Sequence, residues 1–266
     1  MRTIGIDAGG TLAKITYIEK GRFQYKWFLM NQIEKWLPWL QFTAGEAKFH
    51  VTGGKATKLM NRLDNVLSVP EFTAMAEGTR VLLREEGRKL DRFILVSIGT
   101  GTSIYLVDPK NEERVAGTAL GGGSLLGLGK LLTNAQSFQE IMDLAAKGKR
   151  QQVDLVVQDL YDDTVPPIPG DLTASYFEKA HHLDMKKEDL AAALINMIGE
   201  LIISLAFEAA KQHQLQSIVF VGSTLQQNKL LKEVLSRFEK MLHYEAIFIE
   251  KGAFVGARGA YHFHTT

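Results

Sequence analysis

The stretch Ile4-Gly5-Ile6-Asp7-Ala8-Gly9-Gly10-Thr11 decides the fold of this chain. An apolar run over residues 3–7, typical of a buried strand, ends at an aspartate before two glycines and a threonine. Glycine amides can approach phosphate oxygens closely, and an aspartate at the end of a strand is well placed to hold Mg²⁺. An ordinary hairpin turn is the better explanation of DAGG when that sequence is taken alone. The candidate phosphate ligands are Asp7, Ala8, Gly9, Gly10 and Thr11, with Lys14 as a lesser candidate and Asp7 as the candidate metal ligand.

A second loop repeats this pattern farther along the chain. Gly99-Thr100-Gly101-Thr102-Ser103 follows the strand-like run 92–98 and precedes another strand-like run, Ser103-Ile-Tyr-Leu-Val. One such loop is weak evidence of a phosphate site. Two loops that each close a hydrophobic strand predict two hairpins facing one polyphosphate, with Thr100 and Gly101 as ligands.

Two further glycine-containing segments stand next to helical patterns. Gly121-Gly122-Gly123-Ser124 opens the pattern LLGLGKLL, and the free amides of a helix N-terminus suit an anion. The alternative is a flexible connector with Ser124 as the helix cap. Gly222-Ser223-Thr224 follows the strand-like run 217–222, where a nucleotide base or ribose would lie.

Other nucleotide-binding patterns and several function classes are excluded. The chain has no G-x-x-x-x-G-K-[ST] sequence, and no G-x-G-x-x-G follows a strand. Its 31 basic and 30 acidic residues leave no excess charge for nucleic acid or an anionic membrane. With no cysteine among 266 residues, the sequence offers no disulfide or thiolate site, and cytoplasm is the expected compartment.

Periodicity predicts an α/β protein with mixed sheets. Residues 12–28 are expected to form a hairpin that turns near Gly21, and an apolar stripe between 190 and 209 predicts a long buried helix. Further helices are expected over 31–41, 54–63, 72–86, 137–147, 227–241 and 254–262. We expect a domain boundary near residue 115, which gives domains 1–115 and 116–266.

The order DAGGT at 7–11, GTGTS at 99–103 and VGST at 221–224 resembles the phosphate and adenosine motifs of the acetate and sugar kinase superfamily, which includes actin and heat-shock-70 proteins. This resemblance implies two RNase-H-like domains with mixed sheets flanked by helices and ATP in the cleft between them. A narrower resemblance is to type II pantothenate kinases. It rests on IDAGGTLAKI, VTGGKA, the Glu71 region, SIGTGTS, ERVAGTALGGGSLLGLG and PPIPGDLTASYF, which together cover nearly the whole chain.

The family resemblance implies an activity. It implies transfer of the γ-phosphate of Mg²⁺-ATP to pantothenate, giving 4′-phosphopantothenate in the first step towards coenzyme A. It also implies a cytoplasmic homodimer in which helix 187–212 contributes to the interface. Nucleic acid and membrane are not expected as partners.

The resemblance also implies roles for individual residues. Glu71 falls on the family's general base, although from sequence alone it is better explained as a favourable charge in the first turn of a helix. Arg114, otherwise a surface charge, becomes a substrate ligand with Thr100 and Thr102. The further nucleotide-binding positions are Gly122, Gly123, Ser124, Leu125, Leu126, Phe138, Gly222, Ser223 and Thr224, and the stiff loop Pro166–Asp171 is expected at the rim of the active site.

Two other functions remain open at this stage. A sugar or N-acetylhexosamine kinase of the same superfamily would have similar glycine loops but would use an aspartate base in another segment. A nucleotide-gated ATPase of the actin or chaperone type would hydrolyse ATP slowly without a small-molecule acceptor. The small size of the chain argues against a chaperone.

Overall fold

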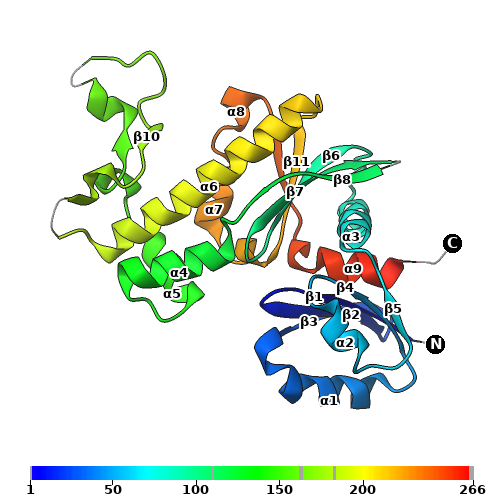
Figure 1. The fold of residues 1–266 in the computed structure, drawn as a ribbon. Helices are drawn as coiled ribbons and strands as arrows, with labels where there is room; N and C mark the ends of the chain where they lie inside the picture. The colour runs from blue at the N-terminus through cyan, green and yellow to red at the C-terminus, as the bar shows by residue number, and fades with distance from the viewer. Residues whose placement is uncertain (1, 110, 162–163, 182–183, 264–266) are drawn as a thin grey trace.

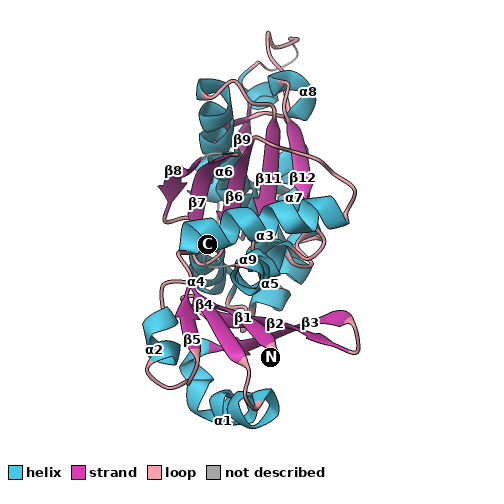
Figure 2. Ribbon diagram, turned by 90° about the vertical axis from the view of Figure 1, so that its right-hand side faces the viewer, coloured by secondary structure: helices cyan, strands magenta, loops and turns pink. Residues whose placement is uncertain are grey.

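Two mixed sheets with the same strand arrangement form the framework of the protein. The computed structural model describes residues 2–109, 111–161, 164–181 and 184–263, and within these ranges it contains two five-stranded sheets. Figures 1 and 2 show one sheet beneath the other. This arrangement confirms the predicted α/β fold with mixed sheets flanked by helices.

In the first sheet the strands are ordered β3-β2-β1-β4-β5. Their bounds are β1 Thr3–Ala8, β2 Leu12–Glu19, β3 Arg22–Leu29, β4 Lys48–Thr52 and β5 Val66–Ser68. The predicted hairpin is confirmed, since β2 and β3 pair antiparallel around Lys20 and Gly21, which have φ values of 50° and 74°. Positive φ at both central residues is the geometry of a tight hairpin turn.

In the second sheet the order is β12-β11-β6-β7-β8. The bounds are β6 Phe93–Ile98, β7 Thr102–Asp108, β8 Asn111–Thr118, β11 Ser217–Val221 and β12 Glu245–Phe248. As in the first sheet, the central strand pairs antiparallel with the strand that follows it and parallel with a strand from later in the chain. The hairpins β1–β2 and β6–β7 therefore occupy equivalent positions.

Each sheet is covered on one face by its own helices. The first sheet packs against α1 (Ile33–Ala44) through Trp36, Leu37 and Leu40. The short helix α2 (Ala56–Met60) follows β4, and it is shorter than the predicted 54–63 because Gly53 has φ 94° and Gly54 still belongs to the turn. Glycine in these positions favours a turn over a helix start.

The second sheet packs against a cluster of helices around α6 (Lys187–Gln212). This cluster comprises α4 (Gly122–Thr133), α5 (Phe138–Ala145) and α7 (Lys229–Ser236). By length and composition α6 could span a membrane, but most of its apolar window is buried inside the protein, which is the environment of a core helix. The predicted helix 227–241 divides at Arg237–Phe238 into α7 and α8 (Glu239–Leu242).

The remaining two helices are exchanged between the sheets. Helix α3 (Glu71–Glu85) follows the first sheet in sequence but packs on the second, whereas α9 (Val255–His262) follows the second and packs on the first. The two helices cross where Gly78 and Gly259 lie against each other's backbone, and a Cβ on either glycine would collide with the facing helix. Figure 1 shows α3 and α9 between the two sheets.

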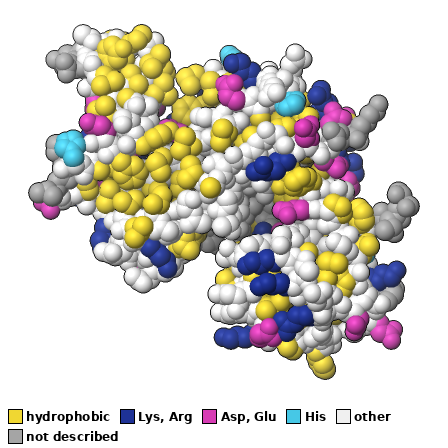
Figure 3. Space-filling model, viewed as in Figure 1, with side chains coloured by type: hydrophobic (Ala, Val, Ile, Leu, Met, Phe, Trp, Pro, Cys, Tyr) yellow, Lys and Arg dark blue, Asp and Glu magenta, His cyan; other side chains and the backbone are white. Residues whose placement is uncertain are grey.

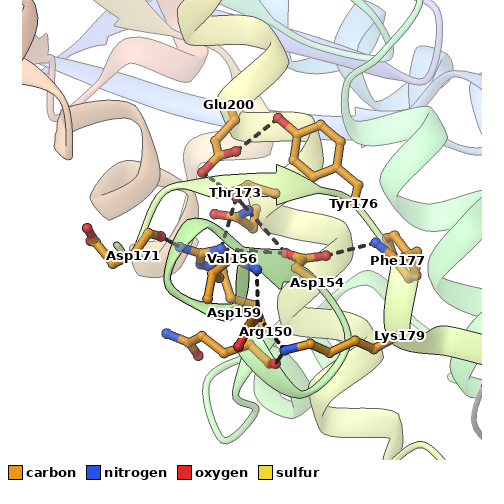
Figure 4. Close-up of polar contacts among 12 residues, drawn as sticks. Arg150, Asp154, Val156, Asp159, Asp171, Thr173, Tyr176, Phe177, Lys179 and Glu200 are labelled. Carbon is orange, nitrogen blue, oxygen red and sulfur yellow. Dashed lines mark hydrogen bonds and ion pairs between the residues drawn. The ribbon is translucent and has the colours of Figure 1, made fainter. Parts of the chain in front are cut away.

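An arm of short elements extends from the far end of α6. It contains η2 (Arg150–Gln152), β9 (Leu155–Val156), η3 (Val157–Leu160), β10 (Thr173–Ser175) and η4 (Glu178–His181). Figure 4 shows the polar network beneath it, in which Glu200 accepts hydrogen bonds from Thr173 Oγ1 at 3.1 Å and Tyr176 Oη at 2.9 Å. Arg150 also donates to Thr173 Oγ1, at 2.9 Å. The arm is therefore attached to α6 by polar side chains.

The boundary expected near residue 115 falls inside β8, the edge strand of the second sheet. The first strand of that sheet begins at Phe93, and the first sheet ends with β5. The chain therefore leaves the first sheet before it enters the second at residue 93. Helix α9, at the end of the chain, packs on the first sheet again. Domains 1–115 and 116–266 therefore remain a prediction, and the sheets are divided earlier in the chain.

Candidate functional site

A cavity of about 510 Å³ opens between the two sheets and is lined by both. The first sheet contributes the β1–β2 hairpin and the turn after β4, and the second contributes the β6–β7 hairpin and part of β8. The start of α3 and the segment Gly252–Val255 before and at the start of α9 complete the wall. A polar cavity between two glycine-rich hairpins is the place predicted for a polyphosphate.

The tips of the two hairpins are in direct contact. Thr11 Oγ1 lies 3.2 Å from Thr100 Oγ1, and a Cβ on Gly10 would lie 3.4 Å from the same Thr100 oxygen. Gly9 and Gly101 line the cavity on either side of this contact. The structure therefore brings together the two loops that the sequence predicted to face one ligand.

Asp7 and Lys14 face each other across the first hairpin. They are paired in the β1–β2 register, and Lys14 Nζ lies 3.3 Å from Asp7 Oδ2. Both side chains are 13% exposed. Among the described residues no group of three or more histidine, cysteine, aspartate or glutamate side chains could hold a metal. Mg²⁺ in phosphoryl-transfer sites is commonly held by one or two carboxylates, waters and substrate phosphates, and Asp7 fits that arrangement.

Glu71 stands at the first residue of α3 and borders the cavity. Desolvation by the cavity walls raises the pKa of this carboxyl above its ordinary value, and the negative charge of Asp7 raises it further, whereas Lys14 opposes the shift. A carboxylate with a raised pKa is a better proton acceptor than an ordinary one, because Brønsted behaviour favours a pKa closer to the working pH. Glu71 therefore has the location and the electrostatic environment of a general base.

Arg114 enters the cavity from β8. Its Nε donates to Ser103 Oγ at the long distance of 3.5 Å, and the residue is paired with Tyr105 across β7 and β8.

Tyr105 is 4% exposed and its ring lies 5.1 Å from that of Phe72, which neighbours Glu71. Burial raises the pKa of Tyr105, so its phenol is a neutral group beside Glu71. Thr102, a predicted substrate ligand, also lines the cavity, but its hydroxyl donates to Leu120 O at 2.8 Å.

The N-terminus of α4 is packed against the second hairpin. Gly122 N donates to Gly99 O at 2.8 Å and Gly123 N donates to Thr100 O at 2.9 Å. These two amides therefore already have backbone partners and are not the free donors expected of a helix N-terminus, and nucleotide binding at Gly122 and Gly123 remains a prediction. Cβ atoms on Gly122 and Gly123 would also collide with neighbouring atoms, so the glycines serve close packing. Ser124 is not the cap either, because Gly121 is the N-cap and Ser124 Oγ donates to Ala119 O at 3.0 Å.

The other predicted nucleotide-binding residues divide into two groups. Gly222 and Ser223, before and in η5 (Ser223–Leu225), line the cavity, and the neighbouring Thr224 donates from Oγ1 to Gly99 O at 3.0 Å. The side chains of Ala8, Leu125, Leu126 and Phe138 pack in hydrophobic clusters and do not line the cavity. Their contact with a nucleotide remains a prediction. The loop Pro166–Asp171 belongs to the arm and also does not line the cavity of its own chain.

Several residues that line the cavity received no role from the sequence, among them Lys55, Ser97 and Tyr105. Lys55 lies in the VTGGKA segment, where a glycine pair after a buried strand and before a cation was an available signal. In the sequence, Tyr105 belongs to a strand-like run of alternating residues, which suggests only an ordinary position in the hydrophobic core. Its position beside Glu71 depends on the exchange of α3 onto the second sheet.

Comparisons with known proteins show the family of this chain. The Fumble family model matches residues 21–262. A type II pantothenate kinase from Oceanobacillus iheyensis is 43% identical over 264 residues, covering 98% of each chain, and one from Staphylococcus epidermidis is 38% identical over 261 residues, covering 97% of this chain and 98% of the relative. This chain belongs to the type II pantothenate kinase family.

Solved structures of more distant proteins share the fold of this pantothenate kinase family member. The activator of 2-hydroxyisocaproyl-CoA dehydratase from Clostridium difficile, with bound ADPNP, has a TM-score of 0.64 at 18% identity and covers 98% of this chain and 93% of the activator. A ROK family glucokinase from Streptomyces griseus, in complex with glucose and AMPPNP, has a TM-score of 0.62 at 16% identity and covers 98% of both chains. At this identity the likeness concerns the fold alone.

Proposed function

We propose that this protein is an ATP-dependent pantothenate kinase that converts pantothenate to 4′-phosphopantothenate, the first step of coenzyme A biosynthesis. The observation that carries the proposal is the position of Glu71, which borders the same cavity as the two joined glycine hairpins and has a raised pKa. Family membership supplies the acceptor, because the relatives of similar length are named type II pantothenate kinases.

In this proposal the two hairpins bind the polyphosphate of ATP. Backbone amides at Gly9, Gly10 and Gly101 and the hydroxyls of Thr11 and Thr100 supply donors around the point where the hairpins meet. Gly222 and Ser223 lie on the other side of the cavity, where the nucleoside would extend. Lys14 adds a positive charge to the first hairpin while it orients Asp7.

Asp7 would hold Mg²⁺ together with the phosphate oxygens of the nucleotide. The ion, when bound, neutralises charge that builds up on the transferring phosphoryl group. Glu71 then accepts the proton of the substrate hydroxyl, and the hydroxyl oxygen attacks the terminal phosphorus as the bond to ADP breaks. Arg114 donates to the acceptor and stabilises negative charge during the transfer.

We also propose that the protein works as a cytoplasmic homodimer. Helix α4, the arm and α6 carry exposed hydrophobic side chains, among them Leu131, Val165 and Leu205, at exposures of 80%, 92% and 39%. Figure 3 shows hydrophobic side chains gathered over the region of α4 and α6. Exposed apolar surface of this kind is typical of a protein interface. In a dimer, the loop Pro166–Asp171 would be presented to the partner subunit, where it would form the predicted rim.

A sugar kinase of the same fold is the second candidate, because a ROK glucokinase shares the fold. The experiment that separates the candidates measures ADP release from Mg²⁺-ATP with pantothenate, with a panel of sugars including N-acetylglucosamine, and with no acceptor. Release that depends on pantothenate supports the proposal. Turnover only with a sugar would overturn the acceptor, and acceptor-independent turnover would indicate a gated ATPase.

A further inference from the structure

Lys55 is a cation in the cavity that is not paired with a carboxylate. In the described part of the chain the cavity wall contains the cations Lys14, Lys55 and Arg114 and the carboxylates Asp7 and Glu71. Lys14 is paired with Asp7 at 3.3 Å. No ion pair involves Lys55 in the described ranges, where its ammonium donates instead to the carbonyl oxygen of Gly10. An ammonium that bonds only a neutral carbonyl can exchange it for an anionic oxygen at little cost.

The backbone fixes the origin of this side chain on the first hairpin. Lys55 N donates to Ala8 O at 2.9 Å, so the turn after β4 is attached to the end of β1. Gly53, with φ 94°, allows this approach, because a Cβ there would lie 2.7 Å from Asp7 Oδ1 and 2.6 Å from Ala8 O. The backbone of Lys55 therefore lies beside Ala8, and its side chain ends at Gly10.

A lysine at position 55 does not stabilise the start of helix α2. Lys55 is the N-cap residue of α2, and its side chain makes no cap hydrogen bond. Serine, threonine, aspartate and asparagine are the residues that stabilise an N-cap, because their oxygens accept from the first free amides. Residues that contradict local preference without local compensation are expected mainly at functional sites.

The end of the side chain lies at the junction of the two hairpins. Gly10, which accepts from Lys55, is also the residue whose Cβ position lies 3.4 Å from Thr100 Oγ1. The neighbouring Thr11 bonds Thr100 at 3.2 Å. A ligand that bridges the hairpins would thus meet Lys55, Thr11 and Thr100 at the same place.

From this arrangement we propose that Lys55 binds the terminal phosphate of ATP, leaving the Gly10 carbonyl when the nucleotide enters. The proposal rests on the proposed function only for the identity of the nucleotide. Lys14 remains paired with Asp7 at the metal site, so Lys55 supplies the separate positive charge that distinguishes a nucleoside triphosphate from a diphosphate. In chemical terms its partner is a phosphate oxygen that ADP lacks.

The test is equilibrium binding of AMPPNP and of ADP, each with Mg²⁺, to the full chain carrying Lys55→Met. The matched control is Lys58→Met, three positions along on the exposed side of α2 and absent from the cavity wall. We expect Lys55→Met to weaken AMPPNP binding by roughly tenfold or more, as for loss of a charge-assisted hydrogen bond, with ADP binding unchanged. Lys55→Arg should keep most of the preference for AMPPNP.

Three results would overturn the proposal. AMPPNP binding equal to wild type would show no phosphate contact, and equal weakening of AMPPNP and ADP would show that Lys55 only supports the hairpin. A rise confined to the KM for pantothenate would assign the ammonium to the acceptor carboxylate. If Lys55→Met does not fold, Lys55→Gln replaces it. Because binding of AMPPNP requires no acceptor, failure of the proposed kinase activity would be seen separately, in the wild-type turnover assay.

Discussion

Thr11 Oγ1 and Thr100 Oγ1 lie 3.2 Å apart although 89 positions separate them in the sequence. Each threonine stands at the tip of a β-hairpin, and each hairpin starts at the central strand of its own sheet. The contact therefore joins the two halves of the molecule at the point where the polyphosphate is proposed to bind. Glu71, at the start of α3, lines the same cavity as both hairpins.

Replacement of the proposed base should abolish phosphoryl transfer without loss of nucleotide binding. We expect Glu71→Gln to lower kcat by roughly 10²–10⁴-fold, the usual contribution of a general base, because the amide cannot accept the proton. AMPPNP binding should change little. Glu77→Gln, on the same helix and paired with Arg80 at 3.8 Å, is the matched control. Near-normal turnover by Glu71→Gln would favour a sugar-kinase mechanism with another base.

The raised pKa of Glu71 gives turnover a predictable pH dependence. Only the ionised carboxylate accepts a proton, so kcat at saturating pantothenate should fall as the pH drops through an ionisation above the ordinary value of 4.5. AMPPNP binding measured over the same range controls for loss of the nucleotide site. An acid limb at or below 4.5 would contradict the environment described for this carboxyl.

The same pKa shift should be visible in stability, with the opposite sign. Because the folded state binds this proton more tightly than the unfolded state, its contribution is fully present below the unfolded pKa and is lost as the pH rises through the folded pKa. Wild type should therefore lose stability relative to Glu71→Gln as the pH is raised through this window. Thermal unfolding of both proteins across that range is the measurement, and parallel curves would contradict the shift.

The packing of α4 on the second hairpin predicts different effects for two glycines of one helix. A Cβ at Gly122 would lie 2.5 Å from Thr224 Oγ1, whereas a Cβ at Gly127 would meet nothing within 4 Å. Gly122→Ala should cost about 1–3 kcal/mol in unfolding free energy and weaken AMPPNP binding. Gly127→Ala should be neutral or stabilising by up to about 1 kcal/mol, since alanine is the better helix former. Urea unfolding distinguishes the two, and equal effects would contradict the described contact.

Removing one partner from the polar network between the arm and α6 should lower the free energy of unfolding substantially. Glu200 accepts from Thr173 and Tyr176 and lies 3.2 Å from Arg237 NH1, while its own side chain is 9% exposed. Glu200→Ala leaves Arg237 partly buried without this partner and should cost about 3 kcal/mol. Glu208→Ala, 69% exposed on the same helix, should change stability by less than about 0.5 kcal/mol. Urea midpoints measure both, and a small effect of Glu200→Ala would show that water replaces the network.

The proposed dimer predicts which surface leucine matters for assembly. Leu131 on α4 is 80% exposed, and Phe42 on α1 is 89% exposed on the other half of the molecule. Leu131→Glu should shift the protein towards monomer, because an interfacial carboxylate would be desolvated, whereas Phe42→Glu should leave assembly unchanged. Sedimentation velocity at several concentrations measures the shift. A monomeric wild type would reject the dimer itself.

The parts of the fold that could be predicted from sequence depend on local patterns. Buried strands ending in glycine loops, the hairpin around Gly21 and the α6 stripe are specified by residues close together in the chain, and all appear in the structure. The prediction that the hairpins at Asp7 and Thr100 meet also holds. The residue types in a loop and the spacing of apolar residues along a helix or strand can both be recognised in a single sequence.

What could not be predicted depends on contacts between distant segments. The exchange of α3 and α9 has no local signature, and it decides that Glu71 lies beside Tyr105. The amides of Gly122 and Gly123 read as free at a helix start, but tertiary packing gives them partners on the second hairpin. The glycine pair before Lys55 hints at a loop near a ligand, but that the Lys55 ammonium reaches Gly10 on the first hairpin depends on tertiary packing.

The crossing of α3 and α9 has a consequence for how the protein tolerates change. At Gly78 and Gly259 the helices meet backbone to backbone, and each helix is fixed to a different sheet. A methyl group at either position would act as a spacer, moving the sheets apart and separating the hairpin tips that are proposed to bind the phosphates. The two glycines thus control the spacing between the sheets although neither of them lines the cavity, so a mutation there would resemble an active-site defect while every lining residue kept its identity.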